Sequence, residues 1–187
     1  KFTQSTKYLQ DKEVYLYEDP FELLSTTETL HLYLASAEWR EDHIKCLRST
    51  FVAKLDERYY QRRLLYKAPS SKRKPQEWIE HADQVIIVLT YTKDNQPSVQ
   101  LLNNGAQGLI KTLQYSNYPV LYAEPDCLVL GSYNLTARTS CSMWVKHSAL
   151  RRPLKDCKFV LLSLCTNPVY NAYLYEKQYC NASTQSG

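Results

Sequence analysis

The chain has 187 residues, of which 44% are hydrophobic and 22% are charged, and its formal net charge is +4. This length and composition predict one globular domain with a substantial core, and they argue against a disordered chain or a pair of domains. The small and mixed charge does not indicate a nucleic-acid partner, and no apolar run approaches the roughly 20 residues of a membrane span, so we expect a soluble protein.

The first predicted element is a short helical turn at residues 19–24, where Asp19 can cap the helix and Pro20 can take its first position. A strand follows in which Leu30, Leu32 and Leu34 share one face. Seven further strands are predicted at residues 46–55, 59–67, 84–92, 98–103, 118–123, 127–133 and 141–147. Eight short strands with close connections, in a chain with sixteen tyrosines, predict an all-β fold with an antiparallel barrel that can hold one small ligand.

The last predicted element is a helix at residues 154–165, which would carry an apolar stripe of Cys157, Val160, Leu161, Leu164 and Cys165. Laid on the outside of a barrel, this helix would present two cysteines to the strands that carry Cys127 and Cys141. We therefore expect a single domain over residues 1–187, with an N-terminal segment (1–28), a barrel (29–148), a helix (153–166) and a tail (167–187).

Secretion is indicated by six cysteines together with two glycosylation acceptors, Asn134 and Asn181, each in an Asn-x-Ser/Thr triplet. The chain begins at Lys1 without a charged and then apolar leader, so we expect the mature form of a disulfide-bonded extracellular glycoprotein. Six cysteines allow fifteen pairings, and the sequence by itself does not select one.

Catalytic motifs are missing from the sequence. It has four histidines but no Gly-x-Ser-x-Gly elbow, no HExxH and no glycine-rich phosphate loop. His43 and Cys46 have a spacing that could serve a metal, yet no second pair completes such a site. We therefore expect a protein that is not an enzyme and that has neither a cofactor nor a metal centre.

Four segments carry a resemblance to a known family: "EWREDHIKC", "DCLVLGSYNLTARTSCSMWVK", "DCKFVLLSLCTNP" and "YEKQYC". Their order resembles the salivary lipocalins of ticks, the family of the histamine-binding proteins. Within it the chain looks most like hard-tick proteins of the japanin type, which share a "TCSLW" strand and a cysteine in the following helix. The resemblance implies an eight-stranded lipocalin barrel with the C-terminal helix packed on its outside. It also implies secretion in saliva and the disulfides Cys46–Cys180, Cys127–Cys157 and Cys141–Cys165.

The resemblance further implies a ligand, because members of the family capture host mediators such as histamine, serotonin, leukotrienes, fatty acids or cholesterol. Amine-binding relatives have an aspartate after a cysteine and a later Glu-Leu-Trp strand. This chain has Leu128 and Ser142 at the two acidic positions and keeps Trp144. A buried ammonium without a paired anion costs several kcal/mol or more, so we expect a hydrophobic or amphipathic ligand, namely a sterol, fatty acid or eicosanoid.

Two other functions remain open at this point. Glu38 beside Trp39 could form a single site for a biogenic amine, and the basic loops could bind a host immune-cell protein. Arg62 or Arg63 is a candidate partner for a ligand carboxylate, since only one of two neighbours in a strand points inward. We expect a monomer that binds neither nucleic acid nor a membrane.

The residues expected to line the pocket are Tyr33, Glu38, Trp39, Tyr66, Trp78, Tyr91, Tyr122, Leu128, Ser142 and Trp144. For these aromatic and acidic side chains a purely structural interpretation competes with the functional one. Aromatic side chains fill the interior of small barrels irrespective of the ligand that is bound, and carboxylates are mostly exposed to solvent at the rim of the barrel.

Overall fold

The computed structural model of the chain describes residues 15–36, 44–70, 77–91, 96–102, 117–132 and 139–180. The predicted pocket residues Glu38 and Trp39 and the glycosylation acceptors Asn134 and Asn181 lie outside these ranges.

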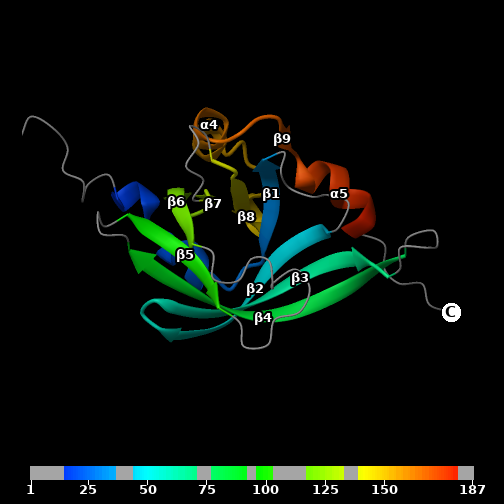
Figure 1. Cartoon of the computed structure of the whole chain (residues 1–187), viewed down its shortest axis with the longest axis horizontal. Helices are drawn as coiled ribbons and strands as arrows, with labels where there is room; N and C mark the ends of the chain where they lie inside the picture. The colour runs from blue at the N-terminus through cyan, green and yellow to red at the C-terminus, as the bar shows by residue number, and fades with distance from the viewer. Residues whose placement is uncertain are drawn as a thin grey trace, which may run out of the picture.

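Eight antiparallel strands form a closed barrel (Figure 1). They are β1 (Leu30–Ser36), β2 (Lys45–Asp56), β3 (Tyr59–Pro69), β4 (Trp78–Tyr91), β5 (Pro97–Leu102), β6 (Asn117–Glu124), β7 (Cys127–Leu130) and β8 (Ser142–Lys146). Neighbours pair in the order β2-β3-β4-β5-β6-β7-β8-β1, and β1 also pairs with β2, which closes the barrel. The predicted eight-stranded barrel is therefore confirmed.

The start of β4 is where the sequence prediction is furthest from the structure, because the strand begins at Trp78 and not at Gln84. Its first residues pair with the end of β3, from Leu64 opposite Asp83 to Pro69 opposite Trp78. Most side chains in residues 78–84 are exposed, whichever face they lie on. A strand without a buried face has no apolar alternation, so its sequence did not reveal it.

A short helix, α2 (Phe21–Ser25), follows the 3-10 turn η1 (Tyr15–Glu18) and closes one end of the barrel interior. Leu23 and Leu24 of α2 are 1% and 2% exposed and belong to the interior core. The Asp19 side chain accepts a hydrogen bond from the backbone N–H of Phe21 (3.0 Å), but the N-cap residue is Pro20 and no side chain caps the helix as predicted for Asp19. Pro20 precedes the first helical residue instead of occupying that position.

Two hydrophobic cores lie on the two faces of β7 and β8. The inner core fills the barrel, and the outer core lies between these strands and α4 (Lys155–Leu164) on the outside of the barrel. Because successive side chains of a strand point to opposite faces, Leu128 and Leu130 belong to the inner core, whereas Cys127 and Val129 belong to the outer core. The predicted outer helix is thus present and almost coincides with the expected range.

Disulfides join Cys46 to Cys180, Cys127 to Cys157 and Cys141 to Cys165, and these are the pairs that the family resemblance implies. Two of the bonds attach α4 and the residue after it to the strands beneath. The clustering of cysteines between residues 127 and 165 therefore reflects the attachment of one helix to one face of the barrel wall.

The C-terminal segment contains more structure than the expected tail. A two-residue strand, β9 (Val169–Tyr170), pairs with the end of β1, and α5 (Ala172–Cys180) packs against β1 and β2 (Figure 1). Glu176 of α5 is 3% exposed and accepts a hydrogen bond from the backbone N–H of Cys46 (2.6 Å). The helix is held by this bond and the Cys46–Cys180 disulfide and has only a weak apolar stripe, so the 3.6-residue pattern did not predict it.

In the part of the chain that the structure describes, no helix combines the length and the apolar character needed to cross a membrane.

Candidate functional site

A cavity of about 240 Å³ lies inside the barrel. It is lined by Leu24, Leu30, Ser36, Leu47, Ser49, Leu64, Ile87, Val99, Leu101, Tyr118, Leu128, Leu130, Gly131, Ser132, Ser140, Cys141, Ser142 and Trp144. Every barrel strand contributes at least one of these residues, in most cases from the inward positions of an alternating pattern such as Leu128 and Leu130. The cavity is therefore the space that the inner core leaves unfilled.

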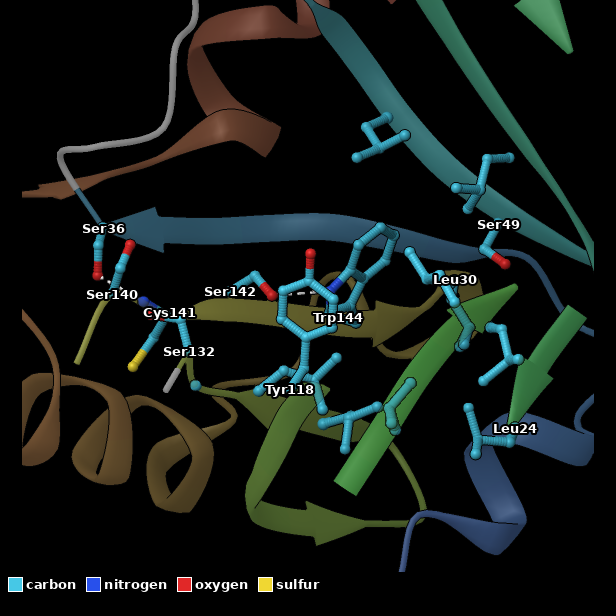
Figure 2. A pocket seen from close by; sticks show the side chains of 18 residues that line it. Leu24, Leu30, Ser36, Ser49, Tyr118, Ser132, Ser140, Cys141, Ser142 and Trp144 are labelled. Atoms are coloured by element: carbon cyan, nitrogen blue, oxygen red, sulfur yellow. Dashed lines mark hydrogen bonds between the residues drawn. The ribbon is translucent and has the colours of Figure 1, made fainter. Parts of the chain in front are cut away.

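One end of the cavity is more polar than the other. Figure 2 shows Ser36, Ser132 and Ser140 together where β1 ends and β8 begins, whereas Leu24 lies at the opposite end, on α2, where the polar side chain in the lining is Ser49 and its hydroxyl is bonded to Arg62. Hydroxyl groups can donate and accept hydrogen bonds, and leucine side chains can do neither. The wall is therefore suited to a molecule with a polar end and an apolar body.

Trp144 and Ser142 project from the same face of β8 into the middle of the cavity (Figure 2). The Trp144 indole Nε1 donates a hydrogen bond to Ser142 Oγ at 3.0 Å. The indole has no second donor, so its ring offers the ligand an apolar surface. The Ser142 hydroxyl accepts that bond and keeps its own proton, which it can donate to a ligand oxygen.

No residue that the structure describes in this lining has a formally charged side chain. A ligand ammonium in this space would lose its hydration without gaining a counter-charge from these residues, which costs several kcal/mol. A ligand carboxylate buried there would carry the same cost, whereas neutral ligands and apolar chains carry none. The lining therefore favours uncharged molecules, or amphipathic ones whose charged end stays in contact with water.

Arg62 on β3 has a charged side chain that is 0% exposed, and it is bonded to two residues of the cavity lining, Leu24 and Ser49. Its Nε donates to Ser49 Oγ (2.8 Å), Nη1 to the carbonyl oxygens of Leu24 (2.9 Å) and Thr26 (3.1 Å), and Nη2 to those of Glu28 (3.3 Å) and Ser49 (3.2 Å). These five bonds use all five donors of the guanidinium. Arg62 thus anchors α2 and the following residues to the barrel.

The hydrogen bonds of Arg62 determine whether its side chain can bind a ligand carboxylate. Burial lowers the pKa of Arg62 to about 10, so the side chain stays protonated at neutral pH. It points inward, as one of the two candidate arginines must, whereas Arg63 is exposed. With every donor already bonded to the protein, Arg62 has none left for a ligand carboxylate.

Three of the predicted pocket residues, Leu128, Ser142 and Trp144, line the cavity. Tyr33 lies on the outer side of β1, where it stacks on Tyr173 of α5 with ring centroids 5.5 Å apart. Tyr122 packs against the outer core, where burial and then the nearby Glu124 carboxylate raise the pKa of its hydroxyl.

The remaining aromatic candidates are also absent from the cavity lining. Tyr66 is buried and donates a hydrogen bond to Asp83 Oδ2 (2.7 Å). Trp78 lies 5.2 Å from the Lys45 ammonium, measured to the ring centroid. Tyr91 is 46% exposed at the end of β4. Tyr66 belongs to the inner core without lining the cavity, and Trp78 and Tyr91 have a structural contact or an exposed surface elsewhere.

The sequence argument missed Tyr118, Ser36, Ser49, Ser132 and Ser140, which together with the predicted Ser142 supply the polar side chains of the cavity. A signal was present for some of them, because Leu47 and Ser49 alternate on β2 as Leu128 and Leu130 do on β7. Following inward positions strand by strand would have identified more of the lining than selecting aromatic residues did.

The family model for the tick histamine-binding proteins matches residues 8–182 of the chain. The chain belongs to this family of tick salivary lipocalins. Proteins of this kind are ligand carriers and not enzymes, so this lipocalin binds a small molecule. Its three disulfides are consistent with secretion.

Solved structures with the same fold include two ligand complexes and a lobster protein. Japanin from Rhipicephalus appendiculatus bound to cholesterol has a TM-score of 0.62 and 18% identity, over 78% of this lipocalin and 91% of japanin. A serotonin complex of AM182 has a TM-score of 0.50 and 11% identity, over 81% and 87% of the two chains. Lobster apocrustacyanin A1 has a TM-score of 0.50 and 11% identity, over 89% and 91%. At these identities the likeness shows the fold. No sequence among the curated proteins matches that of this lipocalin.

Proposed function

We propose that this lipocalin sequesters a small hydrophobic or amphipathic host molecule in its barrel, of the sterol, fatty acid or eicosanoid class, and thereby modulates the inflammatory and immune defence of the host. The observation that carries the proposal is the lack of charge among the described lining residues. Family membership supports the carrier role, and the cholesterol bound by japanin is an example of such a ligand in a related fold.

The polarity of the cavity suggests how the ligand is oriented. Its hydroxyl or carboxyl end lies near Ser132, Ser140 and Ser142, where donors and acceptors are available, and its apolar body points toward Leu24 on α2. Each Å² of apolar surface removed from water contributes about 25 cal/mol, so about 200 Å² of buried ligand surface contributes about 5 kcal/mol. Hydrophobic burial thus supplies most of the affinity, and the serines fix the direction of binding.

The cavity size sets a second condition on the ligand. A dry cavity of about 150 Å³ accommodates benzene, and pockets for drug-sized molecules have about 300–1,000 Å³, so the 240 Å³ observed here lies between these cases. A sterol or a long acyl chain would fill this space and continue toward the polar end. A fatty-acid series should therefore show affinity that rises with chain length and then levels off.

A biogenic amine is the alternative ligand, and the family description and the serotonin complex of AM182 are the observations in its favour. In this lipocalin Leu128 and Ser142 stand where amine-binding relatives have carboxylates, and both line the cavity. The remaining acidic candidate, Glu38, lies outside the described residues. The amine proposal thus lacks a placed anion, which makes the hydrophobic ligand the better supported proposal.

Calorimetric titration with fatty acids, cholesterol, leukotrienes, histamine and serotonin tests the proposal. We expect uptake of at least one lipid, and native mass spectrometry of protein from a secretory host should show a co-purifying lipid that is lost on delipidation. Leu128→Asp should weaken lipid binding at least tenfold, because it introduces a carboxylate into the wall. Val52→Asp is the matched control, since Val52 is 41% exposed. Tight amine binding without uptake of any lipid would overturn the proposal.

A further inference from the structure

Two histidines meet on the outside of the barrel. His31 lies on β1, and His147 begins the 3-10 turn η2 (His147–Ala149) directly after β8. The distance from His31 Nε2 to His147 Nδ1 is 3.1 Å, and the ring centroids are 5.2 Å apart. The two residues are 116 positions apart in the sequence, so this pair could not be recognised from residue spacing.

The barrel holds the backbone of both histidines in place. His31 is paired with Val145 of β8 and with Arg48 of β2, at the seam where β1 closes the barrel. The backbone N–H of His147 donates to the carbonyl oxygen of Thr29 at 2.9 Å. His31 is half-buried and His147 is exposed, so only the His147 ring is free to turn toward solvent. The pair is thus preorganised by the sheet and reachable from outside.

We propose that His31 and His147 form a binding site for a zinc ion on the outer wall of the barrel. Zinc binds histidine nitrogens at about 2.0–2.1 Å, which places two nitrogens of a tetrahedral site about 3.3 Å apart. The observed 3.1 Å is close to this separation, and a reorientation of the two rings, with the exposed His147 ring the freer of the two, would direct both lone pairs at one point. The ion takes the place of the proton in the N–H···N hydrogen bond, and the ring that donated it carries its proton on its other nitrogen, so that both histidines bind as neutral imidazoles and no net proton is released.

The charges around the pair are mixed. Glu28 interacts electrostatically with His147, and its Oε2 accepts a hydrogen bond from the backbone N–H of Ser148 (3.0 Å). Lys146 and Arg48 oppose a cation, although Arg48 also forms an ion pair with Glu80 (2.7 Å). These groups neither exclude a divalent cation nor bind it strongly.

The number of protein ligands sets the strength of the site. Structural zinc sites have four protein ligands and catalytic ones have three, so a two-histidine site leaves open positions for water. We therefore expect micromolar and readily reversible binding. Because it joins β1 to the residue after β8, the bound ion should also raise the thermal midpoint of the barrel.

Titration calorimetry with zinc chloride tests the site, using the full chain without a histidine tag and after dialysis against a chelator. We expect saturation at no more than one zinc ion per chain. His147→Gln should weaken binding at least tenfold, and so should His31→Gln. His81→Gln is the matched control, because His81 is an exposed histidine that stacks on Tyr66 and is not part of the pair.

A second measurement covers the case in which the half-buried His31 variant is unstable. Crystals of the wild type soaked in zinc should show an anomalous peak about 2.0–2.1 Å from both His31 Nε2 and His147 Nδ1. No zinc binding, equal binding by wild type and His147→Gln, or equal losses in His147→Gln and His81→Gln would each overturn the proposal.

Discussion

The two faces of β7 and β8 carry hydrophobic cores that differ in packing. On the outer face, Met143 and Val145 are fully buried under α4, and disulfides fix the helix in place. On the inner face, Ser142 and Trp144 border a cavity of about 240 Å³. Neighbouring residues of one strand therefore serve stability and ligand binding separately, because alternation sends them to opposite sides.

A large expected effect tests the outer core alone. Removing the Cys127–Cys157 bond with a double alanine variant should lower the free energy of unfolding by about 3.6 kcal/mol, the value that chain entropy gives for a loop of 30 residues. Neither cysteine lines the cavity, so the affinity for a lipid should stay within twofold of the wild type. Urea unfolding and calorimetry measure the two quantities. A large loss of affinity in the folded variant would show that the two cores are not separate.

A second test compares neighbours on β8. Met143→Ala should destabilise the chain by about 2–5 kcal/mol, because Met143 is 0% exposed and its loss leaves a void in the outer core. Trp144→Ala should instead act on binding, with a tenfold or greater loss of lipid affinity and a smaller loss of stability, because the ring borders space that is already empty. Equal effects of the two variants on binding would contradict the separation of the faces.

A smaller effect concerns the polar end of the cavity. Ser142→Ala removes the acceptor for the Trp144 indole and a donor for the ligand. A typical hydrogen bond contributes about 0.5–1.5 kcal/mol, so we expect a loss of affinity of about two- to tenfold for a ligand with a hydroxyl or carboxyl end. A ligand without such a group should be affected less. Titration with a fatty alcohol and with the matching alkane would show the difference.

The smallest effect is on the pH dependence of stability at the edge of the outer core. Burial, and then the nearby Asp156, raise the pKa of Glu124 above 4.5. The folded chain then binds this proton more tightly than the unfolded chain. Its stabilising contribution is complete below about pH 4.5 and is lost as the pH rises through the raised pKa.

Glu124→Gln, which keeps the side chain neutral, should match the wild type at pH 4 and be slightly more stable at pH 7. Unfolding in urea at the two pH values measures this difference. A variant that is less stable than the wild type at pH 7 would contradict the sign. Lipid affinity should not change, since Glu124 is not among the residues that line the cavity.

The sequence predicted the barrel well because its strands carry alternating leucines and valines between short turns, and burial of one face enforces that pattern. It predicted α4 for the same reason, from an apolar stripe with a period of 3.6 residues. It did not predict α5 or the first residues of β4, which are held by a disulfide, by Glu176 and by strand pairing without a buried face.

The candidate site was harder to predict than the fold. Leu128, Ser142 and Trp144 were found through the resemblance to a family pattern, and all three line the cavity. Aromatic residues such as Tyr33 and Tyr122 were selected by type, yet tyrosine also packs on the outer face of a barrel. The inward position of a side chain depends on the register of all the strands, which composition does not reveal.

The most direct test of the account is a parallel titration of the delipidated wild type with cholesterol and with serotonin. The claim is that a cavity without charge among its described lining residues selects a ligand that places no charged group inside it. We predict saturable binding of cholesterol and at least tenfold weaker binding of serotonin. Serotonin binding that is tighter than that of cholesterol would contradict the claim.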